Sequence, residues 1–236
     1  MTYSDAAPRA EAIKVMTRTH QMPPWKATVG CGDLADPRVL STDEIDLISK
    51  WVENGAPEGN RADLPAARQF TGGWALGQPD MVLSYPVAYT PPATGDMYRC
   101  FPLPTNLPAD QYVSAIDIKP GDAATVHHVI AYLDTTGESL KMDEKDPGPG
   151  YTSFGGPGFS ITSAGASTLG GWAPGARPLM LPETVAYSLP AKTTVVLQVH
   201  YHPHDGAPKP DITQIGIYFA KKKPSKTMYI LPLINT

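Results

Sequence analysis

The sequence predicts a mainly β protein, an antiparallel β-sandwich with a small N-terminal helical segment. Short apolar runs recur from residue 81 onward, and 26 prolines and 21 glycines are spread along the chain without a period. This pattern is typical of many short strands joined by turns. Apolar residues at helical spacing are confined to the first sixty positions. Hydrophobic residues make up 42% of the 236 residues, which suffices for a substantial core.

The helical segment is predicted over residues 1–60. A first helix is expected near residues 5–20, followed by the sequence Met-Pro-Pro-Trp. A second helix is predicted to begin at Ser41, because a serine followed three residues later by Glu44 forms a capping box. Its apolar stripe at helical spacing consists of Ile45, Ile48, Trp51 and Val52. Gly55 and Pro57 mark its end. So short a unit has little core of its own.

The remainder of the chain is predicted to be a linker and a β-sandwich domain. Residues 61–78 form the linker and residues 79–236 the domain. Residues 135–176 are rich in glycine and are predicted to form a long loop, which is uncommon in a compact domain and often functional. The clearest expected strands are residues 81–85, 111–118, 126–133, 195–201, 212–220 and 227–231.

Charge and composition argue against several classes of protein. The formal net charge is −4 and there is no basic stripe, so we expect no nucleic-acid partner. There is no run of eighteen apolar residues, so we expect no membrane span. The first residues lack the pattern of a signal peptide. The two cysteines, Cys31 and Cys100, allow at most one disulfide, and the sequence leaves open whether they pair.

Histidines are the clearest candidates for functional residues. Five of the six histidines fall in two short strand-like segments. His127 and His128 are adjacent in the first segment, and His200, His202 and His204 lie close together in the second. Imidazole is well suited to copper and zinc. Two apolar strands can bring such side chains together, although about seventy residues separate them in the sequence.

The spacing of the histidines restricts how they can share one ion. In a regular strand His127 and His128 point to opposite faces. They can share an ion only at a bulge, at a strand end, or through different ring nitrogens. His200 and His202 are two apart and share a face, whereas His204 follows a proline and is expected beyond the strand. Three histidines with open positions suit a redox-active or catalytic metal, and a structural role for the histidines is the alternative.

Three motifs of the second part of the chain resemble one enzyme family. They are Val-His-His-Val at 126–129, Gly-Trp-Ala-Pro-Gly at 171–175 and Val-Leu-Gln-Val-His-Tyr at 196–201. Together they resemble the type II copper, ascorbate-dependent monooxygenases, such as the peptidylglycine alpha-hydroxylating and dopamine beta-monooxygenases. The resemblance covers residues 79–236 and includes Tyr-Arg-Cys at 98–100.

The resemblance implies a jelly-roll-like β-sandwich that binds one copper ion. In that family two such domains each hold a copper, and this chain is similar to the first, electron-transferring domain. The resemblance implies His127, His128 and His200 as the metal ligands. The oxygen-activating second domain is expected to be absent from this chain, so its enzymatic status stays open. Alternatively, His200 and His202 with Met228 resemble the His-x-His and methionine ligands of the second domain.

The first sixty residues resemble the C-terminal half of a c-type cytochrome domain. In such a domain the methionine of Met-Pro-Pro-Trp, here Met22, is an axial haem ligand. The Cys-x-x-Cys-His motif is missing, so we expect no covalent haem in this chain and a packing role for Met22. Some bacterial proteins join the two folds. The resemblance therefore implies a bacterial protein that is periplasmic or secreted in its native full-length form.

The sequence leads to a first hypothesis and two alternatives. The first is a copper-binding, electron-transfer-type domain of a copper-dependent monooxygenase-like oxidoreductase. Its expected partners are an unknown small-molecule substrate and an electron donor, ascorbate or another. The second is a non-enzymatic mononuclear copper-binding or electron-relay protein. The third is an interaction module in which the histidines are structural. The sequence does not specify the substrate or the oligomeric state.

Overall fold

The computed structural model describes residues 2–25, 37–66, 73–161, 168–203 and 208–230. The chain divides into two compact units, Met1–Gln69 and Phe70–Thr236. Cys31 and His204 lie outside the described residues, so the structure gives no account of either side chain. In the described part of the chain, no helix has the length and hydrophobicity needed to cross a lipid bilayer.

The N-terminal unit is helical in its described part. Its elements are α1 (Tyr3–Ala6), η1 (Ala7–Arg9), α2 (Ala10–Arg18), α3 (Thr42–Glu53) and η2 (Arg61–Asp63). The predicted capping box of α3 is confirmed, because the Glu44 N–H donates to Ser41 Oγ and the Ser41 N–H donates to the Glu44 carboxylate. The buried core of this unit is small and consists of Ala10, Val52 and Ala56, with Trp51 packed against it.

One expectation for this unit is wrong. Met22 follows α2, and its side chain is 49% exposed, so it does not have the packing role that the sequence predicts. The backbone reverses at the end of α2, where Gln21 and Met22 both donate to the carbonyl of Met16. This reversal leaves the Met22 side chain outside the small core.

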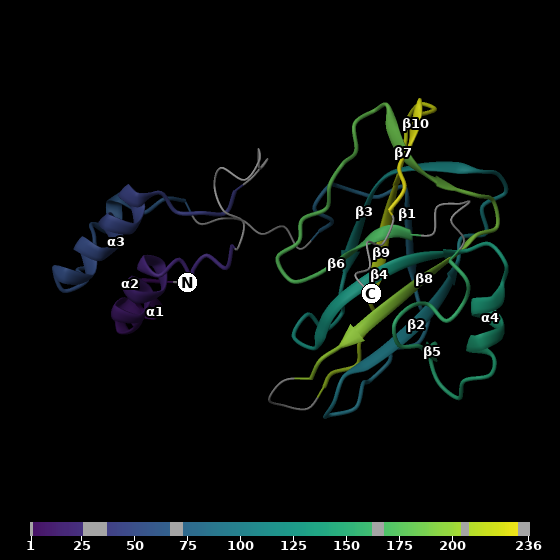
Figure 1. The fold of residues 1–236 in the computed structure, drawn as a ribbon, viewed down its shortest axis with the longest axis horizontal. Coiled ribbons are helices and arrows are strands. Elements are labelled where there is room, and N and C mark those ends of the chain that lie inside the picture. Colours follow the sequence, from purple (N-terminus) through teal and green to yellow (C-terminus); the bar gives the residue numbers. More distant parts are fainter. Residues whose placement is uncertain (1, 26–36, 67–72, 162–167, 204–207, 231–236) are drawn as a thin grey trace, which may run out of the picture. The chain divides into compact units, whose positions relative to one another are not determined.

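The second unit contains two five-stranded sheets (Figure 1). The strand order is β1-β9-β3-β7-β10 in one sheet and β5-β2-β8-β4-β6 in the other. All pairs are antiparallel except the two-residue pair of β10 with β7. The strands are β1 (Met81–Ser84), β2 (Met97–Pro104), β3 (Gln111–Lys119), β4 (Val126–Asp134), β5 (Tyr151–Thr152), β6 (Thr168–Trp172), β7 (Val185–Leu189), β8 (Thr194–Tyr201), β9 (Gln214–Phe219) and β10 (Lys226–Thr227).

The core lies between the two sheets, which makes this unit a β-sandwich and confirms the predicted mainly β class. Val113 of β3 and Ile215 and Ile217 of β9 come from one sheet. Val129 of β4 and Leu197 of β8 come from the other, and all five side chains are fully or almost fully buried. Alternate residues of these strands point to the same face, as expected for extended backbone.

Strand β8 is buried on both faces, which explains its continuous apolar sequence. Its outer face is covered by the segment that follows β4. There, Tyr151 of β5 and the half-buried Phe159 pack with Val196 of β8 and Cys100 of β2. Gln198 of β8 also donates to the carbonyls of Ser153 and Gly156. The end of β8 that carries His200 lies beside the polar side chains of the histidine cluster.

The predicted long loop over 135–176 is wrong. In its described part it contains α4 (Glu138–Asp143), β5 and β6. The Asp134 carboxylate accepts N–H groups from Thr136, Gly137 and Ser139, which turns the chain directly into α4. Gly150 has a φ of +72°, and a Cβ there would lie 2.3 Å from the Cys100 carbonyl oxygen. Glycine therefore allows the close approach of β5 to β2.

Candidate metal centre

The first feature of the site is a β-bulge that contains His127. Strand β4 pairs with β8 so that Val126 lies opposite Tyr201 and His128 lies opposite His200. Two steps along β4 therefore correspond to one step along β8, and His127 is the extra residue. A bulge bends its strand and changes the direction of a side chain. Of the three arrangements that allow adjacent histidines to share an ion, the structure contains the bulge.

The bulge brings three imidazoles together. His128 Nδ1 lies 3.1 Å from His127 Nδ1 and 3.3 Å from His200 Nδ1. A set of ligand atoms from the three rings lies within 4.8 Å of one another. The His200 ring is steeply inclined to the other two, at 63° to His127 and 67° to His128. The structure thus places the three predicted ligands at one point, and this group could hold a metal ion.

The separations of the nitrogens suit a small transition-metal ion. Imidazole nitrogens bind such ions at about 2.0 Å. Two nitrogens 3.1–3.3 Å apart that each lie at that distance subtend roughly 100–110° at a shared ion, which is close to the tetrahedral angle. Nitrogen lone pairs that face one another repel unless a proton or a cation lies between them. The donor set therefore fits a metal ion.

Burial and neighbouring charge favour a neutral His128, the form that metal binding requires. His200 is buried, His128 is half-buried and His127 is exposed, so the cluster opens to solvent on one side. Burial, and then the proximity of His200 and His127, lower the pKa of His128 from its ordinary value. A neutral His128 keeps an unprotonated ring nitrogen available to a cation.

Aromatic side chains support the His200 ring. Tyr98 of β2 stacks on it, with 4.2 Å between ring centroids and 6° between ring planes. Tyr98 lies directly opposite His200 in the β2–β8 pairing. Phe154 contacts the Tyr98 ring edge-on at 5.0 Å, and its own side chain is 82% exposed. This aromatic layer fixes the plane of the His200 ring.

A carboxylate that sequence reasoning missed completes the site. Asp96 Oδ1 lies 3.0 Å from His200 Nε2 and 2.6 Å from His202 Nδ1. These three residues form a second group that could hold a cation, and it shares His200 with the first. Hydrogen bonds from His202 and then from His200 lower the pKa of Asp96.

Two sulfur-containing residues of the β unit are Cys100, which is buried in β2, and Met228, which follows β10. Burial raises the pKa of the Cys100 thiol to about 12, so it remains protonated and unsuited to metal binding at neutral pH. Met228 donates its backbone N–H to Ala186 of β7, which belongs to the sheet that does not carry His200. This bond places the Met228 backbone beside β7, and the alternative grouping of His200 and His202 with Met228 stays a prediction.

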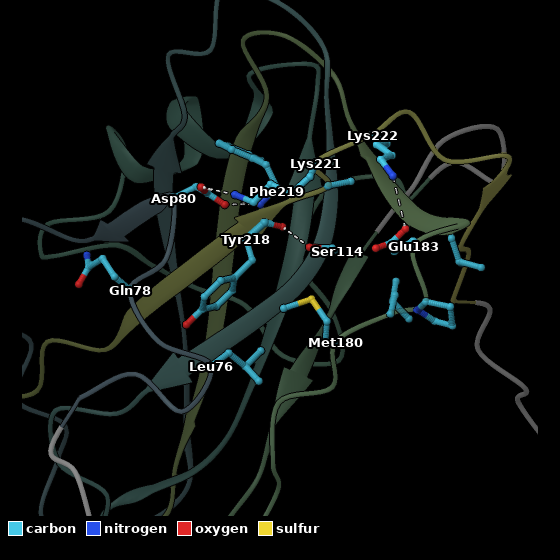
Figure 2. A pocket seen from close by; sticks show the side chains of 14 residues that line it. Leu76, Gln78, Asp80, Ser114, Met180, Glu183, Tyr218, Phe219, Lys221 and Lys222 are labelled. Atoms are coloured by element: carbon cyan, nitrogen blue, oxygen red, sulfur yellow. Dashed lines mark hydrogen bonds and ion pairs between the residues drawn. The ribbon is translucent and has the colours of Figure 1, made fainter.

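The unit also contains a separate pocket of about 420 Å³ (Figure 2). It is lined by residues of β3, β7 and β9 and of adjoining loops, and none of its described lining residues is a histidine. Its charged groups pair with one another, Asp80 with Lys221 at 3.1 Å and Glu183 with Lys222 at 3.9 Å. These charges therefore partly compensate one another at the pocket.

Comparison of the chain with protein-family models and with curated proteins gives no match. Functional interpretation therefore depends on the geometry of the histidine cluster and on the motifs that build it.

Proposed function

We propose that the second unit is a copper-binding, electron-transfer-type domain of a copper-dependent monooxygenase-like oxidoreductase. His127, His128 and His200 would hold the copper through their Nδ1 atoms. The convergence of these three atoms from two paired strands carries the proposal. Neutral imidazoles suit copper, and Cu(II) forms the most stable complexes among the divalent first-row metals. The resemblance of the three sequence motifs to the copper monooxygenases supports copper in particular.

The protein's own contribution would be a rigid and accessible set of ligands. Bound copper supplies one-electron transfer between Cu(I) and Cu(II). The bulge, the buried β8 strand and the Tyr98 stack hold the imidazoles in place, which limits rearrangement between the two states. His127 is exposed, so an electron donor such as ascorbate has access to the cluster. The substrate remains an unknown small molecule.

Metal titration of the purified chain tests this proposal. We expect one copper per chain, and we expect His200→Ala to lose most of the copper binding. His20→Ala is the matched control, because His20 is an exposed histidine of the other unit. Competition with zinc tests the choice of metal. Unchanged copper binding by His200→Ala would contradict the proposal.

A non-enzymatic copper-binding or electron-relay protein is the second candidate. It is favoured by one observation: the described residues contain a single group of three histidines that could hold a metal ion, and the second group shares His200 with it. Ascorbate-dependent oxygen consumption, measured with a broad panel of substrates, separates the two functions. Copper binding without oxygen consumption supports the second candidate, whereas substrate-dependent consumption supports the first.

For the N-terminal unit, we propose a relation to the C-terminal half of c-type cytochrome domains, and a periplasmic or secreted location. The capped helix α3 and the Met-Pro-Pro-Trp segment after α2 support this relation. A Cys-x-x-Cys-His motif encoded upstream of Met1, together with a signal peptide, is the expected result of reading the coding region. A coding region without that motif would contradict the relation.

A further inference from the structure

Asp96 lies immediately before β2, beside the end of β8. Met97 pairs with Tyr201 and Tyr98 with His200, so the residue before β2 is brought next to His200 and His202. A single oxygen, Asp96 Oδ1, contacts both rings, at 3.0 Å and 2.6 Å. The His200 side chain is 9% exposed, whereas the side chains of Asp96 and His202 are about half exposed.

The chemistry of this contact determines which nitrogens carry protons. An ionised carboxylate only accepts hydrogen bonds, so His200 Nε2 and His202 Nδ1 must both be donors. A neutral imidazole has one N–H, and its other nitrogen carries a lone pair. His200 Nδ1 is therefore the unprotonated nitrogen, and it is the atom that lies 3.3 Å from His128 Nδ1. The carboxylate thus frees the nitrogen that the proposed copper site requires.

Stacking on Tyr98 alone cannot determine which nitrogen of His200 faces the other two histidines. Tyr98 fixes the plane of the His200 ring, but a ring turned over by a half rotation stacks equally well. That rotation would replace Nδ1 with a carbon at the point where the three histidines meet. Only a partner at the edge of the ring distinguishes the two orientations, and Asp96 is such a partner at Nε2.

We propose that Asp96 is a positioning residue that holds His200 with its Nδ1 directed at the copper. This inference rests on the proposed function. A carboxylate that accepts from the remote nitrogen of a metal-binding imidazole fixes its tautomer and raises its basicity. A more basic imidazole stabilises Cu(II) more than Cu(I), so Asp96 also lowers the reduction potential of the copper. His202, the second donor, keeps the carboxylate in place.

The same three residues could instead hold a second cation. The observations favour hydrogen bonds, because the carboxylate oxygen lies within direct hydrogen-bonding distance of both ring nitrogens, at 3.0 Å and 2.6 Å. No cation is needed to satisfy the oxygen or the two nitrogens. A second cation is therefore treated as an outcome of the experiment.

The experiment compares wild-type protein with Asp96→Ala, Asp96→Asn, His202→Ala and Glu183→Gln. Affinities for Cu(I) and Cu(II) are measured by competition titration, and the reduction potential by voltammetry. Asp96→Ala should lose roughly 10- to 100-fold in Cu(II) affinity. Asp96→Asn should lose less, since its amide oxygen still accepts a hydrogen bond. A tenfold loss confined to Cu(II) raises the potential by about 59 mV.

The controls separate positioning from general damage. Glu183 is an exposed carboxylate at the separate pocket, so Glu183→Gln should leave affinity and potential unchanged. His202→Ala should lose less Cu(II) affinity than Asp96→Ala, because the bond between Asp96 and His200 remains. In the Cu(I) form, proton NMR should show a protected His200 Nε2–H in wild type and lose it in Asp96→Ala.

Three results would overturn the inference. If Asp96→Ala keeps wild-type affinity and potential while His200→Ala loses copper, the proposed function stands and the role of Asp96 is wrong. If wild type binds two metal ions and His202→Ala removes one of them, Asp96 belongs to a second cation site. If wild type binds no copper, both the proposed function and the role of Asp96 fail.

Discussion

At the scale of single residues, His128 links the site to pH. Burial and two neighbouring imidazoles hold its pKa below the ordinary value of 6.5. The unfolded chain therefore takes up a proton at His128 at a higher pH than the folded protein does. Below about pH 6.5 the metal-free protein loses stability as the pH falls, until the folded-state pKa is passed. Above about pH 6.5, the protonation of His128 no longer changes the free energy of unfolding.

This gives a prediction for the metal-free protein. Its free energy of unfolding, measured with denaturant from about pH 7.5 to about pH 5, should fall with acidification. His128→Asn should show a shallower dependence, because asparagine does not titrate. Parallel curves for wild type and variant would show that His128 does not contribute.

The same residues show how far sequence reasoning reaches. The histidine trio could be predicted, since both segments are strand-like and their motifs resemble those of a known copper family. The arrangement of His127 and His128 could not, because a bulge depends on the register between β4 and β8. Asp96 gives no sequence signal either. It is a single exposed aspartate whose neighbours are set by the pairing of β2 with β8.

At the scale of elements, a partly buried ion pair joins the segment that follows α4 to strand β2. Arg99 of β2 is buried, and its guanidinium donates to both oxygens of Asp146, at 2.7 Å and 3.0 Å. It also donates to the carbonyls of Pro149 and Gly150. The hydrogen bonds from Arg99 lower the pKa of Asp146, so this stabilisation is present above the ordinary aspartate pKa and is lost as the pH falls.

Asp146→Ala should therefore destabilise the β unit by about 1.5–3 kcal/mol, because it leaves a buried guanidinium without its charged partner. The measurement is denaturant unfolding near neutral pH. Glu144→Ala is the matched control, since Glu144 is an exposed carboxylate of the same segment. Equal stabilities of the two variants would show that the ion pair contributes little.

Elements with regular patterns are the ones that the sequence predicts. The sequence predicts five strands whose apolar residues alternate or run continuously, namely β1, β3, β4, β8 and β9. Strand β2 was missed because Pro102 and Pro104 interrupt it. Its pairing with β5 involves only Arg99 and Cys100, so the prolines lie where no partner needs their N–H on that side. The short β5 and glycine-containing β6 have too few apolar residues to form a pattern.

At the scale of the whole molecule, the candidate metal centre lies within one of the two units. The three histidines, Asp96 and the supporting Tyr98 all belong to Phe70–Thr236. Among the described residues, the core cluster of the N-terminal unit has three small or medium side chains, whereas the main core cluster of the β unit has seventeen buried residues. A unit with so small a core has little stability of its own. The two units should therefore differ in stability and in their response to copper.

Copper should stabilise the β unit selectively. A ligand that binds only the folded state adds about 2.7 kcal/mol when its free concentration is one hundred times its Kd. Hydrogen exchange read by mass spectrometry resolves peptides from each unit. Added Cu(I) should slow exchange throughout β4 and β8 and leave α2 and α3 unchanged, because every proposed ligand lies on β4 or β8. His200→Ala should abolish the effect. If copper slows exchange equally in α2 and α3, or still does so in His200→Ala, the stabilisation arises elsewhere than at the histidine cluster.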